Sequence, residues 1–166
     1  NPCNKCEICT GILNGTVLDV IEMDAASNNG VDNIRNIIDE LVYTPSQASY
    51  KVYIIDEVHM LSSGAFNAFL KTLEEPPKHV LFILATTEPN KLPATILSRC
   101  QRFDFRRIST GGIMEWLLLI AKEAGITLTG EAAHFLASLA EGALRDGISL
   151  LDQCISTGRN PIDLKS

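Results

Sequence analysis

The sequence has no long apolar run. None of its 166 residues falls in a stretch near the ~18 consecutive apolar residues of a membrane helix, so we expect no membrane partner. Glycine and proline are not enriched, with only 11 and 7 residues, and hydrophobic residues make up 46%. This composition argues against a collagen-like repeat, a linker or a disordered tail. A net charge of −6 argues against a broad basic face that coats nucleic acid. Because the sequence also lacks an initiator methionine and a leader, we expect a soluble segment of a longer protein.

The apolar pattern predicts an α/β fold for the first two thirds of the chain. Two apolar stripes at helical spacing cover residues 31–41 and 66–73, and the second ends before Pro76 and Pro77. Two of the strand-like runs are apolar on both faces, as buried parallel strands usually are. Strands alternating with helices predict a parallel sheet with right-handed crossovers. The four strand-like runs are residues 17–21, 52–55, 80–85 and 102–106.

The last third of the chain predicts only helices. Residues 109–112 (Ser-Thr-Gly-Gly) are typical of a hinge or a helix cap, and three amphipathic segments follow at 113–124, 131–140 and 144–155. We therefore expect two domains, an α/β domain over residues 1–108 and a small all-α bundle over residues 109–166.

Three of the five cysteines are clustered at the start of the chain. Cys3, Cys6 and Cys9, the cysteine cluster, have a spacing that lets three thiolates converge on one zinc ion. A closed structural zinc site needs four ligands, so the fourth would lie outside the chain or be replaced by water. The alternative is three reduced thiols on a short helix.

An acidic pair follows the strand predicted at 52–55. Asp56 and Glu57 stand where ligands bind in parallel α/β sheets, beyond the carboxyl ends of the strands. An aspartate there can hold hydrated Mg²⁺, and a neighbouring glutamate can polarise an attacking water. The alternative is a strand that ends in two solvated acids.

Four further side chains are candidates for the same chemistry. Thr86 and Thr87 follow the strand at 80–85, so their hydroxyls are expected at the same sheet edge; they could instead cap a turn. Arg99 follows a short helix predicted near residue 93 and could neutralise phosphate charge in a neighbouring site, or be an ordinary surface arginine. Arg145 begins a helix of the bundle, and its alternative role is a salt bridge with a nearby acid.

Together these residues carry a family resemblance. Residues 54–61 (IIDEVHML) resemble the Walker B strand of an AAA+ ATPase, and residues 85–100 (ATTEPNKLPATILSRC) resemble a sensor 1 strand followed by the Ser-Arg-Cys motif of clamp loaders. Residues 144–153 (LRDGISLLDQ) are similar to a sensor 2 helix. With the cysteine cluster, the whole chain resembles the gamma/tau subunits of bacterial DNA polymerase III. The resemblance implies an AAA+ parallel sheet without its P-loop strand, followed by a helical lid.

The resemblance implies a role for each candidate of the nucleotide site. Asp56 would be the magnesium residue and Glu57 the catalytic carboxylate. Thr87 would be sensor 1, with Thr86 as its alternate. Arg145 would be sensor 2 and would reach the nucleotide of its own subunit.

Other implied roles concern the assembly. Arg99 would be the arginine finger that enters the ATP site of the next subunit, and the cysteine cluster would supply three of four zinc ligands. Residues 27–30, with Asn28 and Asn29, and the helix through Arg35 would face DNA inside the ring. Relatives often carry basic residues where this chain has the two asparagines, so Arg35 is the best phosphate candidate.

The implied activity is that of the ATP-driven motor of the clamp loader, which loads the sliding clamp onto primed DNA. The implied cofactors are ATP with Mg²⁺, and Zn²⁺. The implied partners are gamma/tau, delta and delta-prime subunits in a pentameric ring, the clamp and primer-template DNA. The motor would be a cytoplasmic ATPase of a nucleotidyltransferase assembly.

One motif of the family is missing from the sequence. None of the 11 glycines is followed by lysine, so no G-x-x-x-x-G-K-[ST] phosphate loop exists. We therefore expect no ATP hydrolysis by these 166 residues alone, and an exposed strand edge where the P-loop strand would pair.

Two other functions stay open from the sequence. The first is a zinc-dependent binding module, whose fourth ligand would have to be one of His59, His79, His134, Cys100 and Cys154. The second is a catalytically silent clamp-loader relative such as delta-prime, which the intact Asp56–Glu57 pair disfavours.

Overall fold

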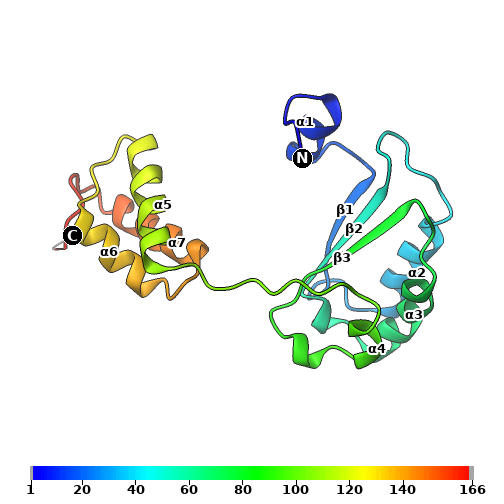
Figure 1. Ribbon diagram of the computed structural model, residues 1–166. Coiled ribbons are helices and arrows are strands. Elements are labelled where there is room, and N and C mark those ends of the chain that lie inside the picture. The colour runs from blue at the N-terminus through cyan, green and yellow to red at the C-terminus, as the bar shows by residue number, and fades with distance from the viewer. Residues whose placement is uncertain (1, 165–166) are drawn as a thin grey trace. The chain divides into compact units, whose positions relative to one another are not determined.

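The computed structural model describes residues 2–164 and divides the chain into two compact units, Asn1–Arg102 and Phe103–Ser166 (Figure 1). No helix in the described residues is long and apolar enough to span a bilayer. The elements of the first unit are α1 (Glu7–Leu13), β1 (Val20–Asp24), α2 (Val31–Glu40), β2 (Lys51–Asp56), the 3₁₀ helix η1 (Val58–Met60), α3 (Ser63–Glu74), β3 (Val80–Leu84), the 3₁₀ helix η2 (Pro89–Lys91) and α4 (Ala94–Leu97). Those of the second unit are α5 (Thr110–Glu123), α6 (Gly130–Leu139) and α7 (Leu144–Ser156).

The first unit contains a parallel sheet in the order β1–β2–β3, which confirms the predicted α/β class. β1 begins three residues later than the run at 17–21 predicts. Residues 17–19 form a turn, in which the backbone N–H of Val20 donates to the carbonyl of Val17 at 3.3 Å. The sheet register places Asp24, the last residue of β1, beside Asp56, the last residue of β2.

Helices α2 and α3 cover one face of the sheet (Figure 1), because each presents an apolar stripe at helical spacing. Their buried core includes Ile34 of α2, Phe69 of α3 and Ile55 of β2, all 0% exposed. The opposite face is more open: Leu81 and Ile83 of β3 are 50% and 45% exposed. The prediction of strands buried on both faces is therefore wrong for β3, because both long helices of this unit pack on the same side.

The predicted fourth strand is absent. Residues 101–109 have no regular structure, and Phe103 and Phe105 are 70% and 97% exposed. An alternating Phe-Asp-Phe pattern forms a strand only where a neighbouring strand accepts and donates its backbone hydrogen bonds. No strand in residues 2–164 pairs with this segment.

A buried carboxylate fixes the loop before β2. Asp19 is 4% exposed, and its oxygens accept hydrogen bonds from the backbone N–H groups of Ser46, Gln47 and Ala48 at 2.8, 2.7 and 2.8 Å. Burial raises the pKa of Asp19, but these three N–H groups and the Ser46 hydroxyl outweigh it and lower the pKa to about 2. The carbonyl of Asp19 accepts from Val52, so the residue also starts the β1–β2 pairing.

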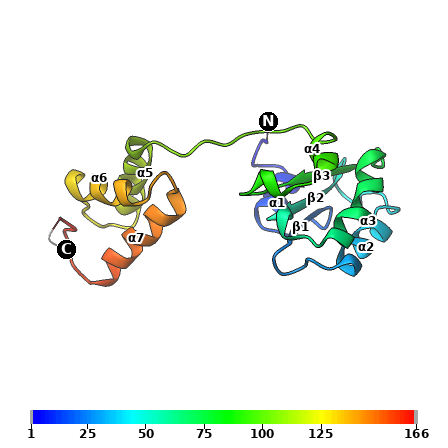
Figure 2. The same cartoon turned by 90° about the horizontal axis from the view of Figure 1, so that it is seen from below.

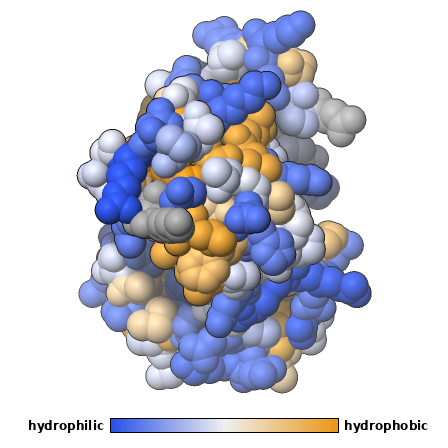
Figure 3. Space-filling view, turned by 90° about the vertical axis from the view of Figure 1, so that its left-hand side faces the viewer, coloured by the Kyte–Doolittle hydropathy of each residue, from blue (hydrophilic) through white to orange (hydrophobic). Residues whose placement is uncertain are grey.

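The second unit is a bundle of α5, α6 and α7 (Figure 2). Ser109 caps α5 and Thr129 caps α6, each accepting a backbone N–H with its side chain. Residues 109–112 therefore contain the predicted helix cap. The core has small and branched side chains, including the fully buried Ile113 and Leu117. Apolar side chains also gather on the face that Figure 3 shows. Phe135 of α6 is 52% exposed.

Candidate functional site

Backbone hydrogen bonds join the carboxyl ends of β2 and β3. The N–H of Ala85 donates to Ile55, and the N–H of Val58 donates to Ala85, both at 2.9 Å. These bonds hold the segment after Asp56 against the threonines that follow β3. The two candidate groups that the sequence predicted at one sheet edge do lie together.

Glu57 contacts the predicted sensor threonine. Its Oε2 accepts from the Thr87 hydroxyl at 3.0 Å and from the Thr87 N–H at 3.4 Å. Its backbone is left-handed, with φ +47°, which is uncommon outside glycine. The Glu57 N–H donates to Oδ1 of Asp56 at 2.9 Å, and Asp56 is exposed. One carboxylate is thus open to solvent ligands, and its neighbour is held against Thr87.

His59 belongs to the same network, although the sequence pointed to it only as a spare zinc ligand. Its side chain is 6% exposed, with Nδ1 3.0 Å from the Thr86 hydroxyl and 3.3 Å from Oε2 of Glu57. Its Nε2 lies 3.6 Å from Oε1 of Glu88. The hydrogen bond from Lys91 lowers the pKa of Glu88, against the opposing effect of desolvation, and the positive charge of Lys91 adds to it. Spacing alone gave no signal that this histidine would be buried among acids.

Arg99 has partners within its own unit. Its NH1 donates to the Thr95 carbonyl at 2.7 Å and to the Ser98 hydroxyl at 3.3 Å, and its NH2 pairs with Oε1 of Glu74 at 2.6 Å. The arginine side chain is 32% exposed. None of these contacts involves Asp56 or Glu57, so the structure does not bring Arg99 into the site of its own chain.

Arg145 lies in the first turn of α7, in the second unit, and is exposed. Among the ion pairs of the described residues there is none between Arg145 and Asp146 or Glu141. The salt bridge weighed as its alternative role is therefore not found. The backbone carbonyl of Arg145 accepts from the Ser149 hydroxyl.

The predicted DNA-facing segment is a turn built on Asp24. The carboxylate of Asp24 accepts from the Ala26 N–H at 2.8 Å and the Ser27 hydroxyl at 3.0 Å, and Asn28 donates to the Asp24 carbonyl. Sequence reasoning missed this carboxylate, although an aspartate before small polar residues is a known turn signal. Asn29 is exposed, and so is Arg35 of α2, which pairs with Asp32.

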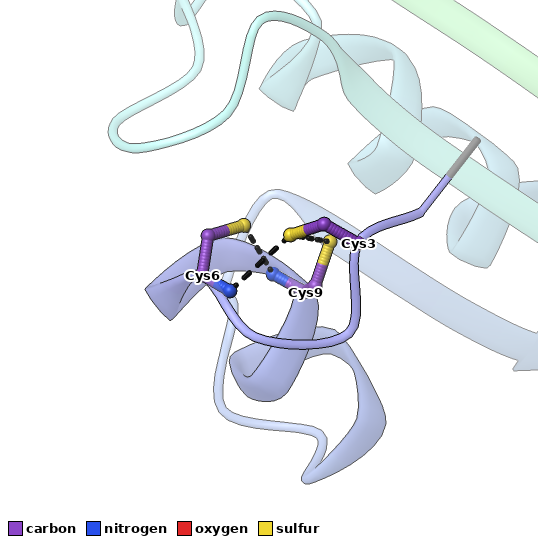
Figure 4. A group of neighbouring side chains, drawn as sticks. All are labelled: Cys3, Cys6 and Cys9. Carbon is purple, nitrogen blue, oxygen red and sulfur yellow. Dashed lines mark hydrogen bonds between the residues drawn. The ribbon is translucent and has the colours of Figure 1, made fainter.

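The cysteine cluster precedes and begins α1, and its three side chains point toward one another (Figure 4). All three sulfurs lie within 4.8 Å of one another, and Sγ of Cys3 is 3.8 Å from Sγ of Cys9. Two thiolates bound at ~2.3 Å to one tetrahedral zinc would lie ~3.8 Å apart, so the geometry fits this metal. Hydrogen bonds from the backbone N–H groups of Lys5 and Cys6 lower the pKa of Cys3 to about 7, which favours its thiolate.

No histidine joins the cysteine cluster within residues 2–164. His59 lies in the carboxylate network, His79 contacts the carbonyl of Leu41 at 3.0 Å, and His134 lines a shallow hollow on α6 with Phe135. The zinc-dependent module with an internal fourth ligand therefore finds no support in this part of the chain.

Solved structures share this architecture. A DNA polymerase III gamma subunit-related protein from Thermotoga maritima aligns with a TM-score of 0.59 and 27% identity, over 81% of this chain and 42% of that one. A mutant of the RuvB motor from the same organism aligns with a TM-score of 0.71 and 16% identity, over 88% and 50%. The fold is that of an AAA+ P-loop protein without its P-loop strand, which confirms the predicted class.

Sequence comparisons narrow the class to a family. The family model for the DNA polymerase III delta subunit matches residues 1–109, and that for the clamp-loader ATPase lid domain matches residues 112–160. The tau subunit of Bacillus subtilis is 59% identical over 93% of this chain, and that of Escherichia coli 47% over 99%. The chain belongs to the DNA polymerase III gamma/tau clamp-loader family. It spans 28% and 26% of the length of those two relatives.

Proposed function

We propose that this chain supplies the catalytic carboxylates and the lid of an ATP-driven clamp-loader motor, which loads a sliding clamp onto primed DNA. The motor works in a pentameric ring with further gamma/tau, delta and delta-prime subunits, as an ATPase of a nucleotidyltransferase assembly in the cytoplasm. The observation that carries the proposal is the contact of 3.0 Å between the Thr87 hydroxyl and Glu57, beside the exposed Asp56.

The carboxylates divide the chemistry of ATP hydrolysis between them. Asp56 offers exposed oxygens, the ligands that Mg²⁺ prefers, and so fits the metal. Bound magnesium would neutralise charge on the phosphates. Glu57 accepts a proton from the attacking water, and Thr87 orients that carboxylate. The phosphate loop has no counterpart in these residues, so this chain provides the metal and water side of the site.

The two arginines act at different nucleotides. Arg99 serves the neighbouring subunit, and it must exchange Glu74 for a phosphate oxygen when it does so. Arg145, exposed at the start of α7, acts as sensor 2 toward the nucleotide of its own subunit. Asn28, Asn29 and Arg35 contact the DNA backbone, where polar and basic side chains bind phosphates. Asn29 and Arg35 are exposed, and Asn28 is partly exposed.

The cysteine cluster serves as three quarters of a structural zinc site. Its sulfur spacing matches a tetrahedral metal, and the fourth ligand comes from outside these residues. Zinc there fixes α1 and the segment before it. It takes no part in hydrolysis.

Substitution of the two carboxylates tests the proposal in the full-length subunit, assembled with its partners. Glu57→Gln should leave ATP binding intact while hydrolysis falls ~10²-fold or more, the typical loss for a positioned base. Glu75→Gln is the matched control, because Glu75 is an exposed glutamate at the end of α3. Hydrolysis at the wild-type rate by Glu57→Gln would refute the assignment.

A further inference from the structure

A buried histidine outside the assigned catalytic set lies between the two segments of the site. His59 is the middle residue of η1, two residues after Glu57, and its side chain is 6% exposed. The left-handed backbone of Glu57 turns the chain sharply at the end of β2. This turn brings the carboxylate of Glu57 and the imidazole of His59 to the same group of side chains.

The imidazole contacts both segments through one nitrogen. Its Nδ1 is 3.0 Å from the Thr86 hydroxyl and 3.3 Å from Oε2 of Glu57. Because a carboxylate oxygen only accepts hydrogen bonds, the second contact needs a proton on Nδ1. The Thr86 hydroxyl is itself fixed by the N–H of Glu88 at 3.0 Å, so the ring is anchored to the segment that follows β3.

Two donors and the imidazole therefore converge on a single oxygen of Glu57. The Thr87 hydroxyl and the Thr87 N–H donate hydrogen bonds to Oε2, and Nδ1 of His59 lies at ion-pair distance from it, 3.3 Å. Contacts from two sides restrict rotation of the carboxylate about its terminal torsion, which is otherwise broad. With Oε2 occupied, Oε1 is the oxygen left to receive a proton from water.

We propose that His59 is a positioning residue for the ATPase reaction: its Nδ1, anchored by Thr86, fixes Oε2 of Glu57 and so presents Oε1 to the attacking water. The inference rests on the proposed function, because it concerns the same carboxylate. It predicts an effect on the chemical step and not on nucleotide affinity, since the imidazole contacts protein groups. A misplaced base loses ~10–100-fold in rate even when all catalytic groups are present.

Two amide substitutions of His59 distinguish the role of Nδ1 from that of Nε2. Asparagine places a polar atom where Nδ1 stands, and glutamine places one where Nε2 stands. In the full-length, assembled subunit, His59→Asn should keep most of the hydrolysis rate. His59→Gln should lower kcat ~10-fold or more with little change in KM for ATP. His79→Gln is the control, because His79 contacts a carbonyl outside the site.

A double-mutant cycle tells positioning from a general structural role. If His59 acts through Glu57, then His59→Gln should cause no further loss in a Glu57→Gln background, measured by single-turnover hydrolysis. An equal fold-loss in both backgrounds, or a wild-type kcat for His59→Gln, would overturn the inference.

If His59→Gln does not fold, Thr86→Val removes the anchor of the ring instead and should give the same loss of kcat. An unchanged kcat for Thr86→Val would again overturn the inference. A wild-type hydrolysis rate for Glu57→Gln would instead refute the proposed function. Failure of the proposed function and failure of the role of His59 are therefore distinguishable.

Discussion

Replacing Asp19 by asparagine should destabilise the first unit in a strongly pH-dependent manner. The carboxylate is 4% exposed and accepts three backbone N–H bonds and one hydroxyl. The fall of its pKa from 3.8 to about 2 corresponds to about 2 kcal/mol of stability at neutral pH. We expect a loss of about 2–3 kcal/mol at pH 7.

The sign of the pH dependence follows from the lowered pKa. A carboxyl group whose pKa is lower in the folded state stabilises the fold fully above its unfolded pKa, and the gain is lost as pH falls through the folded pKa. For Asp19 this window lies between pH ~5 and ~2. The unfolding free energies of wild type and Asp19→Asn should therefore converge across that window.

Urea titrations at a series of pH values measure this effect in one unit at a time. All three tyrosines lie in the first unit, and Trp116, the only tryptophan, lies in the second. Near-UV circular dichroism of the tyrosines should show the shift, while Trp116 fluorescence should not. Asp32→Asn is the control, because Asp32 forms an exposed pair worth less than ~1 kcal/mol. Equal midpoints at pH 7, or a gap that persists at pH 2, would refute the reasoning.

Further outcomes are expected. In rings that mix mutant and wild-type subunits, Arg99→Ala should lower ATP hydrolysis ~10³-fold only when the mutant subunit adjoins an active ATP site. An equal loss in every placement would show that Arg99 acts within its own subunit. The 166-residue polypeptide should hold substoichiometric zinc by elemental analysis, because three thiolates leave the site open; one tightly held zinc per chain would contradict this. The same polypeptide should bind ATP weakly in calorimetry, since it has no phosphate loop, and tight binding would disprove that. Leu117→Ala, at a fully buried position, should destabilise the bundle by ~2–5 kcal/mol in thermal unfolding, and a change below ~1 kcal/mol would contradict this.

The sequence predicted the elements whose signals are local. The cap predicted at 109–112 marks a helix start, where the side chain of Ser109 accepts the N–H of Gly112, three residues ahead. The apolar run before Asp56 defines β2, and parallel pairing alone places its end beside the threonines after β3. These features depend on neighbouring residues in the sequence or on strand order, and the pattern of apolar and polar residues predicts both.

Other features depend on partners that a pattern does not specify. The alternating segment around Phe103 and Phe105 had strand character, but no strand in residues 2–164 takes its hydrogen bonds. The burial of His59 follows from the positive φ of Glu57, an unusual conformation for which glutamate has no preference. The ion pair between Arg99 and Glu74 joins residues 25 positions apart. Each outcome was decided by tertiary packing.

Helix α3 connects the segment after Glu57 with the residue that pairs with Arg99, two parts of the molecule with different proposed roles. It begins at Ser63, immediately beyond η1 and the carboxylate network, and ends at Glu74, which holds Arg99. Its buried side chains, Ala65 and Phe69 among them, lock it to the sheet along its length. Its twelve helical residues span ~18 Å, so one continuous element connects the segment after Glu57 with the acid that pairs with Arg99. Under the proposed function, α3 therefore joins the carboxylate of one nucleotide site to the arginine proposed for the next.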